Sequence, residues 1–262
     1  MGAISLRNVW VEYGEQIVLE RISLEVAAGA FVAIVGPSGC GKSTLLRLIL
    51  GQERPTRGSI ELDGKPLPAE PGPDRGIVFQ RYSVFPHLTV LDNVLVGYDF
   101  AGSPLLGRLT GAARRAAKEQ AHALLKAVGL EGHAAKYPSA LSGGMQQRLA
   151  IAQAIARKPR VLLLDEPFGA LDPGIRAHMH ELIRPLWQAH AMTILMVTHD
   201  LKEGFALGTR LIVLDRWRED PQAQERFGAV ITYDLDLTRD VARGQTPRAD
   251  AGAQLTTLTR GV

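Results

Sequence analysis

The sequence predicts an α/β fold with a mainly parallel sheet, an antiparallel β subdomain at the N-terminus and an inserted α-helical subdomain. Apolar runs of strand length alternate with helical stretches along most of the chain, which is typical of parallel strands buried between helices. At the N-terminus, residues 4–26 instead alternate apolar and polar side chains around turns, which indicates antiparallel strands. Two helical stretches, the amphipathic 111–128 and then 143–158, follow each other before the next buried run.

Each further element rests on a local signal. Continuous apolar runs predict buried strands at 31–35, 161–164 and 193–197, short strands are expected at 59–62 and 76–79, and 229–237 is expected as a last strand. Helices are expected at 43–50, which Gly51 ends, at 111–128, which is rich in Ala, Arg, Lys and Leu, at 143–158, which Pro159 ends, and at about 173–190, between two buried strands. The Pro- and Gly-rich residues 54–74 predict loops, and 239–262 carry no clear pattern.

The composition is that of an ordinary globular chain. Its 262 residues are 46% hydrophobic and 22% charged with a net charge of +3, which excludes disordered, collagen-like and low-complexity classes. The only cysteine, Cys40, permits no intrachain disulfide and fits a reducing compartment. The first residues lack the features of a signal peptide, and no apolar run approaches the roughly 18–20 residues that span a bilayer. We therefore expect a soluble chain whose membrane role, if it has one, comes through a partner.

A glycine-rich loop lies between the expected strand 31–35 and the helix that follows. It matches G-x-x-x-x-G-K-[ST] in full, and this context predicts a P-loop NTPase core that binds ATP. Its backbone N–H groups and the helix N-terminus would surround the phosphates, Lys42 would reach the β- and γ-phosphates, and Ser43 would give its hydroxyl to Mg²⁺. A glycine-rich turn that binds nothing is the alternative. The expected ATP-binding residues are Gly36, Pro37, Ser38, Gly39, Cys40, Gly41, Lys42, Ser43 and Thr44.

Cys40 inside this loop has two interpretations. One is a thiol whose pKa is lowered by the helix N-terminus, and the other is a small residue that simply fits. We favour the second.

A pair of acidic residues follows the expected buried strand 161–164. Ligands bind at the carboxyl edge of such a sheet, so Asp165 is placed to hold Mg²⁺ and Glu166 to polarise an attacking water. Ordinary solvated carboxylates at a strand end are the alternative, and the phosphate loop upstream argues against it.

A second anion site is predicted at the start of the helix 143–158. Ser142 is a suitable N-cap, and Gly143 and Gly144 leave the first N–H groups of the helix open. A plain capped helix is the other interpretation. One nucleotide does not obviously use both this site and the phosphate loop within one subunit.

The segment Leu141–Arg148 together with these motifs resembles the ATP-binding cassette (ABC) ATPases. The resemblance implies that Tyr13 stacks on adenine, that Gln80 senses the γ-phosphate and Mg²⁺, and that His199 is the switch histidine. Residues 169–172 match the D-loop, which ends at Asp172. The resemblance assigns 1–216 to the ATPase domain, about 85–158 to its helical signature subdomain, and 217–262 to a short C-terminal extension.

The resemblance also implies a mechanism in which two copies pair head to tail. ATP then lies between the phosphate loop of one copy and the signature of the other, which comprises Leu141, Ser142, Gly143, Gly144, Met145 and Gln146. The implied catalytic residues are Glu166, His199 and Gln80, and Mg²⁺ is held by Ser43, Gln80 and Asp165.

Within the family, the sequence resembles the nitrate/sulfonate/taurine-type importers, and its later segments resemble a branch found beside urea-carboxylase genes. This implies a peripheral subunit on the cytoplasmic face of the inner membrane. It would power uptake of a small polar or anionic solute through a permease docked near residues 80–100, with a substrate-binding protein acting indirectly and no nucleic acid. Phe85, Leu88 and Val90 suit such a docking surface, although core packing is an equal alternative. Three alternatives to import remain: an ABC ATPase for lipid export, one with a mechanical task outside transport, and a nucleotide-gated binding or regulatory protein with negligible turnover.

Overall fold

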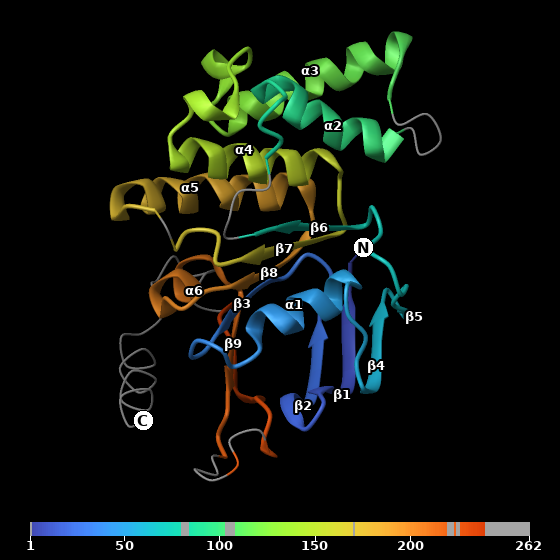
Figure 1. Ribbon diagram of the computed structural model, residues 1–262. Coiled ribbons are helices and arrows are strands. Elements are labelled where there is room, and N and C mark those ends of the chain that lie inside the picture. Colours follow the sequence, from blue (N-terminus) through green and yellow to red (C-terminus); the bar gives the residue numbers. More distant parts are fainter. Residues whose placement is uncertain are drawn as a thin grey trace.

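A computed structural model describes residues 2–79, 84–102, 108–169, 171–218, 223 and 226–238. Two sheets form the framework (Figure 1): one of six strands in the order β10-β9-β3-β8-β7-β6, and one of four in the order β2-β1-β4-β5. Neighbouring strands from β9 to β6 pair in parallel, β10 joins β9 antiparallel, and the four-stranded sheet is antiparallel throughout. The predicted α/β fold is confirmed.

The elements have the following bounds. The strands are β1 Ile4–Tyr13, β2 Gln16–Val26, β3 Phe31–Val35, β4 Arg57–Leu62, β5 Lys65–Pro66, β6 Arg75–Val78, β7 Val161–Asp165, β8 Thr193–Val197, β9 Arg210–Asp215 and β10 Val230–Asp236. The helices are α1 Lys42–Leu50, α2 Val90–Gly102, α3 Gly111–Ala127, α4 Gly143–Ala156, α5 Pro173–His190 and α6 Leu201–Leu207, with short 3-10 turns at Glu131–His133 and Pro138–Ala140.

The central strand β3 divides two hydrophobic cores. All five of its residues are buried, as expected for a parallel strand covered on both faces. Phe31, Ala33 and Val35 pack into the core that contains α2, α4 and α5, whereas Val32 and Ile34 pack into the core formed with α1 and the four-stranded sheet. Figure 1 shows these layers on opposite sides of the six-stranded sheet, with α2, α3 and α4 stacked at one end.

The main difference from the sequence prediction lies between residues 84 and 102. For Val90 the core-packing alternative is confirmed and the docking interpretation is wrong, because Val90 is the first residue of α2 and is fully buried. The helix begins where Thr89 Oγ1 accepts a hydrogen bond from the Asp92 N–H at 3.1 Å and donates one to Asp92 Oδ2 at 2.7 Å. This local start signal, Thr followed three residues later by an acid, is present in the sequence. Val90 is therefore a core residue and not part of a docking surface.

Three further elements were not predicted: the two-residue strand β5, and α6 and β9, which follow β8 in order. Across the part of the chain with described structure, the helices are all too short or too polar to cross a bilayer.

Candidate active site

The loop between β3 and α1 is shaped by its glycines. Gly41 is the N-cap of α1 in the left-handed region, with φ +98°, and a Cβ added there would lie 2.8 Å from Leu19 Cδ2. Glycine alone meets both demands. The Lys42 side chain is 95% buried, with only 5% exposed, and its Nζ donates to the carbonyls of Gly36 at 2.8 Å and Pro37 at 2.7 Å. The ammonium is thus held inside the curve of the loop, beside the N-terminus of α1.

The first residue pair that the fold brings together is Ser43 and Asp165. Ser43 Oγ donates to Asp165 Oδ1 at 3.1 Å, although the residues stand 122 positions apart. Asp165 ends β7 at the carboxyl edge of the parallel sheet. Burial raises the pKa of the Asp165 carboxyl, and the hydrogen bond from Ser43 acts in the opposite direction.

These two side chains fit a magnesium ion. A hydroxyl and a carboxylate are the hard oxygen ligands that Mg²⁺ prefers, and such sites usually take one or two protein carboxylates and complete the shell with phosphates and water. The partly buried Asp165 carboxylate would be compensated by a cation there. Among the described residues, His, Cys, Asp and Glu form no cluster of three or more that would favour an all-protein cage instead.

The second pair is Glu166 and His199. Glu166 Oε2 lies 3.6 Å from His199 Nδ1, and the side chains are 25% and 55% exposed. Glu166 has a left-handed φ of +46°, and its N–H donates to the Val197 carbonyl at 3.0 Å, which anchors the turn to the end of β8. A Cβ added at Gly169 would lie 3.5 Å from His199 Cε1, so the chain passes close beneath the imidazole. The Glu166 carboxylate and the His199 imidazole therefore lie close together, next to Asp165 in the chain.

Tyr13 ends β1 with its side chain 49% exposed. Its hydroxyl donates to the Glu53 carboxylate, and Arg47 pairs with the same carboxylate at 3.3 Å. Burial and Glu53 raise the pKa of Tyr13. Glu53 and Arg47 were not predicted as neighbours of this aromatic residue, because they are distant from it in the sequence, Glu53 by 40 positions.

The segment Leu141–Gln146 forms a capped helix start. Ser142 Oγ accepts from the Met145 N–H at 3.4 Å, which confirms it as the N-cap of α4. Gln146 Nε2 donates to the carbonyls of Pro138 at 3.0 Å and Leu141 at 3.3 Å. A Cβ added at Gly144 would lie 2.8 Å from Ile175 Cγ2. This helix start is thus fixed by the residues just before it in the chain and by Ile175 on the first turn of α5.

Three other predicted residues have mixed outcomes. Cys40 is 3% exposed, its Sγ donates to the Leu214 carbonyl at 3.3 Å, and burial raises the pKa of the thiol, so it is a packed residue. Asp172 is the N-cap residue of α5, and its carbonyl accepts from the Arg176 N–H at 2.9 Å. Gln80 lies outside the described residues, as do Ala170 of the D-loop and residues 239–262.

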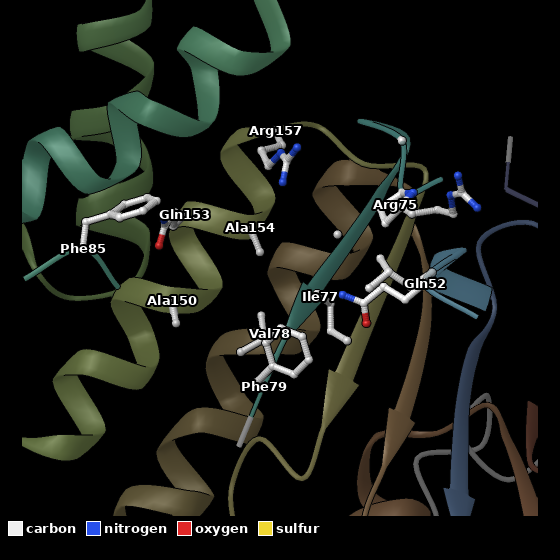
Figure 2. A pocket seen from close by; sticks show the side chains of 14 residues that line it. Gln52, Arg75, Ile77, Val78, Phe79, Phe85, Ala150, Gln153, Ala154 and Arg157 are labelled. Carbon is white, nitrogen blue, oxygen red and sulfur yellow. The ribbon is translucent and has the colours of Figure 1, made fainter. Parts of the chain in front are cut away.

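A separate cavity of about 310 Å³ lies between β6 and α4 (Figure 2). Its apolar walls include Ile77 and Val78 of β6 and Ala150 of α4, and Phe85 lies at its other side. Phe85 is 37% exposed, and its backbone N–H and carbonyl bond to the Asn93 side chain at 2.7 and 3.0 Å, which fixes it against α2. Polar lining residues are Gln52, Arg75, Gln153 and Arg157.

Comparisons with known proteins show which family this chain resembles. A profile described as "ABC transporter" matches residues 19–169. The chain is 44% identical over 253 residues to the aliphatic sulfonates import ATP-binding protein SsuB 1 of Burkholderia lata, covering 92% of this chain and 73% of that protein. It is 41% identical over 242 residues to the bicarbonate transport ATP-binding protein CmpD of Synechocystis, covering 90% and 81%.

Solved structures are similar as well. The dimeric post-hydrolysis state of an ATP-binding cassette bound to ADP and Pi matches with a TM-score of 0.71 and 32% identity, over 89% of this chain and 98% of that one. An inward-facing structure described as a putative metal-chelate type ABC transporter matches with a TM-score of 0.71 and 27% identity, over 91% and 85%.

Proposed function

The chain belongs to the ABC transporter family as an ATPase of the nitrate/sulfonate-type importer group, and we propose that two copies close around ATP to power uptake through a separate permease. The observation that carries the ATP chemistry is the meeting of two residue pairs at one sheet edge. Ser43 and Asp165 lie 3.1 Å apart, and Glu166 and His199 lie 3.6 Å apart. Ser43 belongs to the phosphate loop that holds Lys42, and Glu166 follows Asp165 directly in the chain.

ATP is bound first through backbone groups. The backbone N–H groups of residues 38–44 and the N-terminus of α1 surround the phosphates, while Lys42 turns from the Gly36 and Pro37 carbonyls to the β- and γ-phosphates. Ser43 and Asp165 would hold Mg²⁺, with Gln80 as a third proposed ligand. When bound there, the ion supplies positive charge to the phosphate oxygens. Tyr13 is proposed to stack on adenine, with Glu53 fixing its hydroxyl.

Hydrolysis is assigned to the second pair. Glu166 orients or deprotonates the attacking water, and His199 stabilises negative charge on the γ-phosphate. Their 3.6 Å separation lets the carboxylate and the imidazole act on neighbouring atoms of one substrate. Gln80 is proposed to sense the γ-phosphate.

Dimerisation would give a role to the second helix N-terminus, that of α4 at Ser142. The described contacts of Ser142–Gln146 are made with Ile175, Pro138 and Leu141 of the same chain. We assign its exposed face to the γ-phosphate of ATP on the partner, with Asp172 of the D-loop beside it. ATP then favours the closed pair because it bridges two positive helix ends.

The cavity between β6 and α4 is proposed to receive a cytoplasmic segment of the permease. It is lined by both apolar and polar side chains, and Phe85, which precedes α2, is one of them and is partly exposed. The helical start at Val90 moves the docking surface from the whole of 80–100 to this groove and the residues before α2. The chain would thereby be peripheral to the cytoplasmic face of the inner membrane.

The cargo is proposed to be a small polar or anionic solute, such as a nitrate-, sulfonate- or taurine-like compound or a urea- or guanidinium-related one. Support comes from the names of the relatives, which concern aliphatic sulfonates and bicarbonate. The permease and a substrate-binding protein outside the membrane would select it.

Co-purification tests this function. The chain is affinity-purified from gentle detergent extracts of its own membranes, and the proteins that accompany it are identified. A permease with many membrane spans in equal amount is expected. A soluble or nucleic-acid partner without a permease would leave the ATPase standing and overturn the importer.

A further inference from the structure

Arg176, on the first turn of α5, contacts two segments that flank the proposed hydrolysis site. Its Nη2 donates to the Leu171 carbonyl at 3.3 Å, in the D-loop. Its Nη1 donates to Asp200 Oδ2 at 3.2 Å, and its Nε lies 3.3 Å from Glu203 Oε1. One guanidinium therefore joins the segment before α5 to the start of α6.

The residues on both sides of His199 are tied to the same group. Thr198 Oγ1 donates to Glu203 Oε2 at 2.5 Å, and the Asp200 N–H donates to Thr198 Oγ1 at 3.1 Å. The neighbours of His199 in the chain are thus bonded to each other, to Glu203 and to Arg176. His199 itself is 55% exposed and points to Glu166. Its position is set by its neighbours more than by packing of its own ring.

Arg176 supplies a positive charge to a buried carboxylate, that of Glu203. Glu203 is 3% exposed, and burial raises the pKa of its carboxyl against the opposing effects of Thr198 and Arg176. A buried carboxylate needs charged and hydrogen-bonded partners, and removing one of them leaves the charge uncompensated. Loss of Arg176 would leave the Thr198 hydroxyl bonded to Glu203 and would remove the cation that faces Asp200.

Helix α5 also holds the far end of α6, which lies beside it in Figure 1. Arg184, two turns after Arg176, donates to the Ala206 carbonyl near the C-terminus of α6. Both arginines therefore fix α6 to α5, but only Arg176 contacts the residues next to His199. The pair offers an internal comparison between a contact near the site and one away from it.

We propose that Arg176 is a positioning residue for ATP hydrolysis, which holds His199 at its working distance from Glu166 and links that distance to the D-loop. The inference rests on the roles proposed above for Glu166 and His199. Arg176 acts through Asp200, Glu203 and Thr198 rather than on the substrate. Because Leu171 and Asp200 share one guanidinium, a displacement of the D-loop would be passed to the histidine.

The first experiment compares R176A, R176K and R184A in the full chain. Turnover, ATP affinity and Tm are measured for each. R176A is expected to lower kcat by roughly 10–100-fold, as a small misplacement of a catalytic group does. Its ATP dissociation constant should stay within about 2-fold of wild type, because the phosphate loop is untouched. R176K should recover part of the loss, and R184A should keep wild-type turnover.

A double-mutant cycle then identifies the route of action. R176A is combined with H199A, and the residual turnover is followed with radiolabelled ATP. If Arg176 acts through His199, adding R176A to H199A lowers the rate by less than about 2-fold. An equal loss in both backgrounds overturns the inference, as does an R176A variant with lowered Tm but unchanged kcat. Wild-type turnover in H199A alone would instead overturn the role proposed for His199, and the inference with it.

Discussion

The Nδ1 atom of His199 lies 3.6 Å from Oε2 of Glu166, across the ends of two parallel strands. Glu166 follows β7 directly and turns into the left-handed region, with φ +46°, so its side chain leaves the direction of the strand. Such a backbone costs a non-glycine residue about 1–3 kcal/mol and persists where the surrounding structure enforces it. The hydrogen bond from the Glu166 N–H to the Val197 carbonyl provides that enforcement. The carboxylate is thereby aimed at the histidine loop.

Replacing Glu166 with Gln removes the proposed base and keeps the shape of the side chain. We expect kcat for ATP to fall by roughly 10²–10⁴-fold while ATP still binds, and closed dimers should accumulate on gel filtration with ATP. Glu181→Gln is the matched control, since this side chain is 82% exposed and changes the same charge. An E166Q variant that turns over at the wild-type rate would refute the base assignment.

Replacing Lys42 with Ala removes the ammonium that lies inside the phosphate loop. A charge-assisted hydrogen bond is worth about 1.5–3 kcal/mol, so ATP affinity should fall by roughly 10–150-fold in equilibrium binding of a fluorescent ATP analogue. Lys118→Ala on the exposed side of α3 should leave the affinity unchanged. Equal affinity in K42A and wild type would remove Lys42 from the phosphate site.

The Cys40 thiol should react slowly in the folded chain, because it is 3% exposed and burial raises its pKa. A raised folded-state pKa favours the neutral thiol, so its contribution to stability is present below the ordinary thiol pKa and lost as the pH rises through the folded-state value. Maleimide labelling followed by mass spectrometry should be much slower than in urea-unfolded protein. Fully labelled protein should no longer bind ATP, since the adduct fills the loop, and unchanged affinity would contradict this.

Local signals predicted much of the fold. β8 was predicted at its bounds, Thr193–Val197, because a parallel strand buried on both faces has a continuous apolar sequence. The N-cap at Ser142 was predicted because a capping hydroxyl and its helix are neighbours in the chain. The phosphate loop was predicted for the same reason, because its residues 36–44 are contiguous in the sequence.

The missed features depend on residues distant in sequence. Glu203 is an acidic residue and yet only 3% exposed, because Arg176 of α5 pairs with it. An acidic residue does not indicate a buried position in the sequence, so α6 was not predicted. The fold also brings Ser43 to Asp165, and the sequence showed the two residue types but not their 3.1 Å contact. The start of α2 at Val90 is different, because its signal is local: Thr89 and Asp92 are three residues apart in the sequence, and the helix could have been predicted from them.

Replacing Gly41 with Ala tests the geometry of the phosphate loop. The added methyl would meet Leu19 Cδ2 at 2.8 Å and would require φ +98°, whereas Gly64→Ala requires φ +74° with open space around it. Both variants carry the cost of a left-handed residue, about 1–2 kcal/mol, but only G41A also displaces the N-terminus of α1. We expect a loss of Tm in both, by about 2–4 °C for each kcal/mol, and a loss of ATP binding in G41A alone. ATP binding retained in G41A would show that the loop tolerates the shift.

Replacing Phe85 with Asp tests the proposed docking groove without touching the nucleotide site. Phe85 is 37% exposed at the cavity of about 310 Å³, and its backbone bonds to Asn93 do not involve the ring, so the chain should still fold. A carboxylate there would have to be desolvated against the permease segment, which disfavours the complex. ATP affinity and the basal turnover of the isolated chain should match wild type, while permease co-purification and transport in reconstituted vesicles should fall at least tenfold. Tyr137→Asp introduces the same charge at an aromatic residue that is 51% exposed and does not line the cavity, and it should transport normally. Retained transport in F85D would place the docking surface elsewhere, and a parallel loss of ATP binding would show that the ring supports the nucleotide site instead.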